Sequence, residues 1–245
     1  MFERYLIVML LGHIIADFYT QTQKVAEKKK KEFGVVLRHS ALYFLTITVV
    51  TIPVFSLEIF IMDVVISVSH AVIDIGKYLY CQRKRKDSPL VFVLDQCLHL
   101  VSMIIVSYIW VKRNIPLYEI NIVADFFNIS EISPLFLCKW LLGLLIIHKP
   151  SNILIQNLIG SYKPRQSNDN IIENMQAGRK IGTLERFVML ILLYLNQYSA
   201  IGLVLTAKSI ARYDRITKDA VFAEYYLLGT LISVGISVAC AVILF

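Results

Sequence analysis

Cysteine is scarce in this sequence, and the copies present show none of the spacings that thiol chemistry uses. There is no CxxC pair, so the pattern suggests no disulfide framework. The four cysteines are Cys81, Cys97, Cys138 and Cys240. A glycine-rich nucleotide-binding loop is also missing. We therefore expect the chemistry of this chain to depend on other side chains.

Charged residues are few as well. They make up 18% of the chain, against 57% hydrophobic residues, and the mean hydropathy is +0.63. The apolar residues come in long blocks. This content and arrangement are too apolar for a soluble domain. We predict an all-α fold, a polytopic transmembrane helical bundle of about six to eight membrane helices. The net charge of +7 comes from clustered loop residues that set membrane orientation, so we expect no nucleic-acid partner.

Four apolar blocks in the first half predict four membrane helices, which form one module over residues 1–112. The first block lacks a small-residue cleavage site, so it is interpreted as a retained span. Residues 113–133 are predicted to form an extracytoplasmic connecting segment, and residues 134–245 hold the C-terminal membrane helices. The first four predicted spans cover residues 5–19, 35–56, 57–80 and 90–111.

The C-terminal part is less regular. An apolar stretch over residues 134–147 is predicted to end at a His-Lys-Pro sequence, and the last span covers residues 221–245. Residues 184–213 leave two alternatives open, one long helix or a re-entrant hairpin that turns near Asn196. The hairpin is favoured because it returns Lys208 and its basic neighbours to the cytoplasmic side.

Two basic segments, residues 24–33 and 81–89, connect the first span to the second and the third to the fourth. The positive-inside rule places both in the cytoplasm and the N-terminus outside. The four consecutive lysines at residues 28–31 are interpreted as a solvated loop near anionic lipid.

Histidine and aspartate recur at helical spacing in these spans. His13 and Asp17 are four residues apart, and so are His70 and Asp74, so each pair shares a helix face. With the orientation above, seven such groups fall within roughly 15 Å of the cytoplasmic boundary. They are His13, Asp17, His39, His70, Asp74, Asp95 and His99, and they include four of the five histidines. Ionisable groups inside membrane spans indicate a functional site.

Imidazoles and carboxylates are ligands of divalent transition metals, and we predict that the seven bind zinc, with iron and manganese as alternatives. Seven groups exceed the needs of one four-coordinate ion, so either two metals bind or some groups orient ligands or act as a base. Asp95 and Lys77 are the candidate catalytic residues, and Lys77 would attract an anionic substrate group. A proton relay and a hydrogen-bonded network that fixes helix packing stay open as alternatives.

A second polar set lies in the second half of the chain. It is predicted to bind a phosphate or carboxylate headgroup. The alternative is intramembrane ion pairing by side chains that reach the interface. The set is Glu185, Arg186, Lys208, Arg212 and Glu224.

With these residues named, the chain resembles the domain of unknown function 3307 family, bacterial polytopic membrane proteins, over nearly its whole length. The resemblance implies a multi-pass protein of the bacterial cytoplasmic membrane and brings no established activity. In the first half it rests on His13-x3-Asp17-x3-Gln21, His39, His70-x3-Asp74-x2-Lys77 and Asp95-Gln96-x2-His99. In the second half it rests on Gly178-x2-Ile181-Gly182-x-Leu184-Glu185-Arg186, Ala207-Lys208-Ser209-x2-Arg212 and Glu224-Tyr225-x3-Gly229-Thr230.

The predicted function is a membrane-embedded, metal-dependent hydrolase with its site at the cytoplasmic side of the bilayer. Its expected substrate is a lipid-linked or interfacial ester, because the site would open at the interface. Two alternatives from other classes remain. One is a proton- or ion-coupled transporter or channel that uses the His/Asp cluster, and the other is a non-catalytic membrane partner of a soluble cytoplasmic protein.

Overall fold

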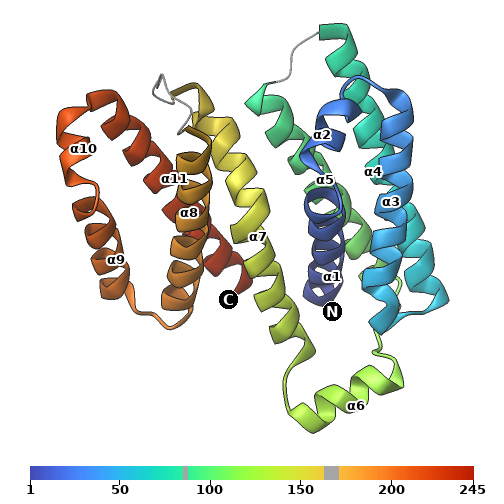
Figure 1. Ribbon diagram of the computed structural model, residues 1–245. Helices are drawn as coiled ribbons and strands as arrows, with labels where there is room; N and C mark the ends of the chain where they lie inside the picture. Colours follow the sequence, from blue (N-terminus) through green and yellow to red (C-terminus); the bar gives the residue numbers. More distant parts are fainter. Residues whose placement is uncertain (85–87, 163–170) are drawn as a thin grey trace. The chain divides into compact units, whose positions relative to one another are not determined.

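The computed structural model describes residues 1–84, 88–162 and 171–245, and the regular elements in these ranges are all helices (Figure 1). This confirms the predicted all-α fold. The chain divides into two compact units, Met1–Leu142 and Gly143–Phe245. The seven histidines and aspartates singled out above all belong to the first unit.

Four helices of the described chain are long and apolar enough to cross a membrane. A fifth crossing is possible if α6 (Asn121–Ser130) and α7 (Pro134–Ile159), bent by 92°, act as one broken span. The predicted number of six to eight is therefore too high. The helix α1 (Phe2–Ile14) spans about 20 Å at 1.5 Å per residue, short of the roughly 30 Å hydrocarbon core. The four candidate spans are Phe33–Val54, Leu57–Lys84, Pro89–Lys112 and Ala220–Leu244.

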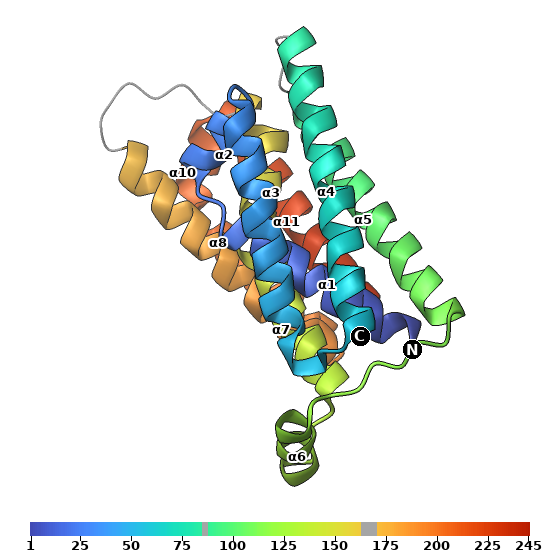
Figure 2. The same cartoon turned by 90° about the vertical axis from the view of Figure 1, so that its right-hand side faces the viewer.

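The first unit packs α3 (Phe33–Thr51), α4 (Leu57–Lys84) and α5 (Pro89–Lys112) with the shorter α1, as Figure 2 shows. The core between them is apolar towards the N-terminal end of α1, where Tyr5 and Met9 are fully buried. A segment after α5 closes this end of the bundle, because the Tyr5 hydroxyl donates to the Ile115 carbonyl at 2.6 Å.

The first predicted span does not stay α-helical to its end. After Ile14 the backbone widens into a π-helical turn, Ile15–Tyr19, which carries Asp17. Such turns are rare and are frequently found at functional sites. The short helix α2 (Gln23–Lys29) follows and begins at Thr22, whose hydroxyl accepts a hydrogen bond from the Val25 N–H at 3.3 Å.

In the second unit, α7 continues to Ile159 and does not end at the predicted His-Lys-Pro sequence. Pro150 has no N–H to donate to the Ile146 carbonyl four residues earlier, which normally weakens or ends a helix. Here the Ser151 hydroxyl donates to that same carbonyl at 2.6 Å. This side-chain bond replaces the missing backbone bond, and the helix passes through the proline.

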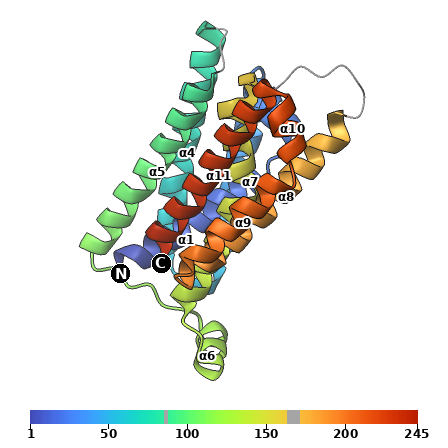
Figure 3. The ribbon, with the colours of Figure 1, turned by 90° about the vertical axis from the view of Figure 1, so that its left-hand side faces the viewer.

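The region that left two alternatives open forms a hairpin. The helix α8 (Ile171–Tyr194) ends just before Asn196, whose φ of 57° turns the chain, and α9 (Tyr198–Ile210) runs back along it (Figure 1). An ion pair of 2.6 Å between Lys208 Nζ and Glu185 Oε2 joins the two arms. This confirms the predicted hairpin turn near Asn196, whereas its re-entrant placement in a membrane stays a prediction. The short α10 (Tyr213–Lys218) leads to α11 (Ala220–Leu244), the red helix of Figure 3, which packs against α8.

Candidate metal centre

All seven histidines and aspartates lie in one buried cluster at the centre of the first unit. The side chains come from α1 and its π-helical turn, from α3, from α4 and from α5, and every residue is at most 8% exposed. The shared depth follows from the antiparallel packing of these helices. The four-residue spacings place His70 above Asp74 on α4 and Asp95 above His99 on α5, each pair facing inwards.

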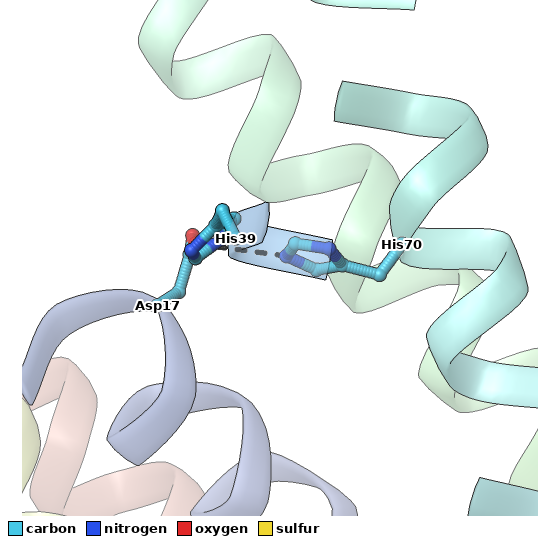
Figure 4. A group of neighbouring side chains, drawn as sticks. All are labelled: Asp17, His39 and His70. Carbon is cyan, nitrogen blue, oxygen red and sulfur yellow. Dashed lines mark hydrogen bonds and ion pairs between the residues drawn. The ribbon is translucent and has the colours of Figure 1, made fainter. Parts of the chain in front are cut away.

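Asp17, His39 and His70 form the first potential ligand group, and Figure 4 shows them pointing towards one another from three separate segments. One carboxylate oxygen, Asp17 Oδ1, lies 3.0 Å from His39 Nε2 and 3.6 Å from His70 Nε2. One ligand atom of each residue lies within 4.8 Å of the others. The π-helical turn makes this possible, because it carries Asp17 into the space between α3 and α4.

The second potential ligand group shares His70 and adds Asp74 and His99. His70 Nδ1 lies 3.6 Å from Asp74 Oδ2, and the His70 and His99 ring centroids are 4.4 Å apart. His70 thus stands between the two groups, with Nε2 towards Asp17 and Nδ1 towards Asp74. An imidazole with a carboxylate near each nitrogen could bridge two ions. It could also be a ligand of one ion, through one of its nitrogens.

Several ligand atoms of this cluster are buried without a hydrogen bond. These atoms are both ring nitrogens of His70, Nδ1 of His39 and Nε2 of His99. In His99 the other nitrogen, Nδ1, lies 2.8 Å from the Asp95 carbonyl oxygen, which accepts only a donated proton. In a neutral His99, Nε2 would then carry the free lone pair that metal ligation requires. A buried polar atom without a partner carries a free-energy cost, which a bound cation would remove.

His13 lies beside the ligand groups and outside them. Its Nδ1 is 3.2 Å from the Tyr43 hydroxyl and its Nε2 is 3.5 Å from Gln96 Oε1, while its ring stacks on His99 at 5.1 Å. Both ring nitrogens are thus engaged by neutral partners. The geometry fits a residue that orients its neighbours better than it fits a ligand.

Asp95, the other predicted ligand outside the two groups, pairs with Lys77. The Lys77 ammonium lies 2.7 Å from Asp95 Oδ2, and Asp95 Oδ1 is buried without a hydrogen bond. Gln96 links this pair to the centre, because its amide donates to Asp95 Oδ2 and to Asp17 Oδ2, each at 3.2 Å. The two predicted catalytic residues therefore contact each other at the edge of the cluster.

Lys29 is a member of the cluster that the sequence did not single out. It was interpreted as part of a solvated lysine run, which is wrong for this residue. Its ammonium is buried and lies 2.8 and 3.0 Å from the two Asp74 oxygens and 3.9 Å from Asp17 Oδ1. Burial alone would lower the pKa of Lys29, but Asp17 and Asp74 outweigh it and raise the pKa above its usual value. Nothing in a run of four lysines distinguishes this one.

Tyr43 is a second member that the sequence did not single out. Its ring stacks on His70 with centroids 3.6 Å apart, and its hydroxyl meets His13. The sequence did contain a signal for this residue, because Tyr43 follows His39 by four residues and so shares its helix face.

The five residues of the second polar set do not form one site in the structure. Arg186 is 1% exposed and donates to the Ile147 carbonyl at 2.7 Å and to Asn152 Oδ1 at 2.7 Å, so its guanidinium is held inside the second unit. Glu185 pairs with Lys208. Arg212 is half-buried and Glu224 is exposed, and among the described residues neither joins that pair. The headgroup-binding role of this set stays a prediction.

The comparisons with known proteins give a family but no activity. No curated protein and no solved structure matches the chain. Residues 5–126 match the model of a family described as protein of unknown function, DUF3307. The match covers the helices that build the His/Asp cluster, whereas the motifs quoted from the second half lie beyond it. The chain therefore belongs to the DUF3307 family, through the helices that carry the cluster.

Proposed function

We propose that the protein is a membrane-embedded, metal-dependent hydrolase that acts on a lipid-linked or interfacial ester. The observation that carries the proposal is the set of buried imidazole nitrogens that make no hydrogen bond, of which the two of His70 lie 3.6 Å from Asp17 and from Asp74. A network that served packing alone would be expected to pair these nitrogens. In this proposal the centre lies near the cytoplasmic face of a bacterial inner membrane, with the N-terminus outside.

The charge and chemistry of the donors fit a divalent transition metal. The carboxylates of Asp17, Asp74 and Asp95 face the ammonium groups of Lys29 and Lys77, which leaves one negative charge in surplus when the histidines are neutral. A mixed imidazole and carboxylate set favours zinc, iron or manganese over magnesium or calcium, which prefer oxygen alone. Zinc is the first choice because it accepts low coordination numbers.

In this proposal a bound metal would lower the pKa of a coordinated water to around 7 and so supply a nucleophile at neutral pH. The chain's own residues would hold the metal, orient its ligands and the substrate, and transfer protons. His39, His70 and His99 would be ligands with Asp17 and Asp74, and the Asp95 carbonyl would fix the tautomer of His99. The unpartnered Asp95 Oδ1 would accept a proton, and Lys77, which is partly exposed, would hold an anionic group of the substrate.

Elemental analysis of protein purified without chelators tests the proposal. Wild type is expected to carry at least one transition metal ion per chain, and a His70→Ala/His99→Ala variant is expected to carry none. His148→Ala is the matched control, since that histidine lies in the second unit, and it should keep the metal. Wild-type protein that stays metal-free, even after incubation with zinc, iron and manganese salts, would contradict the proposal.

One observation favours a second candidate, a proton- or ion-coupled transporter. Buried polar side chains continue along α4 beyond the cluster, at Ser67 and Asp63, where a metal-dependent hydrolase has no evident use for them. Intramembrane carboxyl groups are typical of ion pathways. Flux of protons or metal ions into liposomes that contain the protein, lost in a His70→Ala variant, would select this candidate.

A further inference from the structure

The helix α6 presents a stripe of apolar side chains that no described part of the chain covers. Ile122 is 75% exposed, Phe126 57% and Ile129 84%, and no residue of α6 is buried. Their spacing of four and three residues puts these three side chains on one face of the helix. Large exposed apolar patches mark surfaces that meet another protein or a membrane.

The rest of the helix surface is divided as in an amphipathic helix. Asn121, Asp125 and Asn128 are exposed and repeat the same spacing, so they form a polar stripe on another face. Val123 and Phe127 are half-buried and extend the apolar side. Asp125 is the only charged residue of α6, and the helix has no lysine or arginine. Its attraction to any surface must therefore come from the apolar side chains.

The structure places α6 at the end of the first unit that is remote from the His/Asp cluster. The Ile120 N–H, just before α6, donates to the Pro53 carbonyl at 2.9 Å, in the turn that follows α3. His39 lies near the other end of α3. In Figure 1, α6 lies across the direction of α3 and beyond its end, and it is bent by 92° from α7. A helix perpendicular to the spans runs parallel to the membrane surface.

Lipid is the apolar phase nearest to this stripe. Residues 113–120 connect α6 to α5, a candidate membrane span, and so keep it near the membrane surface. Leu45, Val49 and Ile52 form an exposed apolar stripe on the candidate span Phe33–Val54, which runs up to Pro53 and thus to the start of α6. The apolar surface of α6 therefore continues a surface that faces lipid in a membrane-spanning bundle.

We propose that α6 is an interfacial helix that binds the lipid surface at the membrane face remote from the His/Asp cluster. Ile122, Phe126 and Ile129 enter the boundary between headgroups and acyl chains, whereas the polar stripe faces water. Anionic lipid is not required, because α6 has no basic residue to attract it. The proposal depends on neither the metal nor hydrolysis, and it holds for both candidate functions.

Depth measurements on the full-length protein in phosphatidylcholine vesicles test this placement. The four native cysteines are replaced by alanine, and single cysteines carry the fluorophore NBD. The apolar stripe is labelled in Ile122→Cys, Phe126→Cys and Ile129→Cys, and Asp125→Cys and Asn128→Cys are the matched controls. Quenching is measured with aqueous iodide and with lipids that carry a nitroxide at a shallow or a deep acyl position.

The three labels on the apolar stripe are expected to be quenched several-fold less by iodide than the two controls. They are expected to be quenched more by the shallow nitroxide than by the deep one, because such helices enter only about 5–10 Å into the boundary. Labels at 122 and 129 should lie at equal depth. The depths should not change when a third of the phosphatidylcholine is replaced by phosphatidylglycerol.

Three results would overturn the proposal. Equal iodide quenching of both stripes would place α6 in water. Protection from iodide without quenching by either nitroxide lipid would mean that protein covers the stripe, either a soluble partner or a second copy. A depth that differs by roughly 10 Å between 122 and 129 would make α6 part of a broken span with α7.

A second pair of variants decides if the cysteine-free chain fails to fold. Phe126→Trp and Asn128→Trp are made in the native chain, and tryptophan quenching is compared between brominated and ordinary phosphatidylcholine. Phe126→Trp is expected to add several-fold more quenching to the wild-type signal than Asn128→Trp. Equal added quenching in the two variants would refute the interfacial placement.

Discussion

The Lys29 ammonium lies 2.8 Å from Asp74 Oδ2, inside the buried His/Asp cluster. The pair joins α2 to α4 across 45 positions of sequence and places a positive charge where a metal ion would otherwise balance Asp74. This ammonium therefore sets the charge of the centre and limits how strongly the centre attracts a cation. It also ties the basic segment after the first predicted span to the buried site.

Replacing Lys29 with Met is expected to destabilise the metal-free protein and to strengthen metal binding. Asp74 would lose its cationic partner while staying buried, a change that typically costs about 3–5 kcal/mol in free energy of unfolding. A divalent ion would then recover most of that loss. The measurement is unfolding by denaturing detergent with and without zinc. Lys28→Met is the control, since Lys28 is exposed and should change neither value. A variant as stable as wild type without metal would show that the pair contributes little.

The two histidines at the middle and at the edge of the cluster should differ in their effect on metal content. His70 belongs to both ligand groups, so His70→Ala is expected to abolish metal binding. His13 contacts Tyr43 and Gln96 and lies outside both groups, so His13→Ala is expected to weaken affinity by about 10–100-fold without abolishing it. Competition with a zinc-binding dye measures both affinities. Equal loss in the two variants would place His13 among the ligands.

Asp95→Asn is expected to separate catalysis from metal binding. The substitution keeps the size of the side chain and the carbonyl that orients His99, but removes the proton-accepting oxygen. Hydrolysis of p-nitrophenyl butyrate or bis(p-nitrophenyl) phosphate in micelles should fall by about 10²–10⁴-fold while metal content stays at the wild-type value. Asp125→Asn should keep full activity, because this carboxylate is exposed on α6. Unchanged turnover by Asp95→Asn would remove Asp95 from the reaction.

Ser151→Ala tests the account of how α7 passes through Pro150. The substitution leaves the Ile146 carbonyl without either its backbone or its side-chain donor. Leaving a buried acceptor unpaired typically costs about 1–3 kcal/mol. The loss should appear as a lower thermal midpoint, whereas the exposed Ser209→Ala, which also removes a serine-to-carbonyl bond, should stay within about 0.5 kcal/mol of wild type. Equal midpoints for the two variants would mean that α7 does not need the Ser151 bond.

The sequence was informative wherever helical periodicity alone decides position. The spacing of His70 and Asp74 predicted a shared helix face, and the long apolar blocks predicted an all-α membrane fold. The number of spans was overestimated because α1 and α9, with 13 residues each, were counted as membrane helices, and neither is long enough by itself to span a membrane.

Tertiary placement could not be predicted in the same way. Lys29 looks like its neighbours in a lysine run, and its burial depends on how α2 folds over the bundle. The π-helical turn that positions Asp17 has no sequence signature that separates it from an ordinary helix. Asp63 did carry a signal, because a carboxylate inside an apolar span is rare and lies at helical spacing from His70.

X-ray absorption at the zinc edge of protein purified without chelators is the most direct test of the proposed metal centre. The account predicts zinc bound by nitrogen and oxygen atoms of His39, His70, His99, Asp17 and Asp74, at about 2.0–2.2 Å, with no sulfur contribution. The signal should disappear in His70→Ala. Metal-free protein, a shell containing sulfur, or a spectrum unchanged by His70→Ala would contradict it.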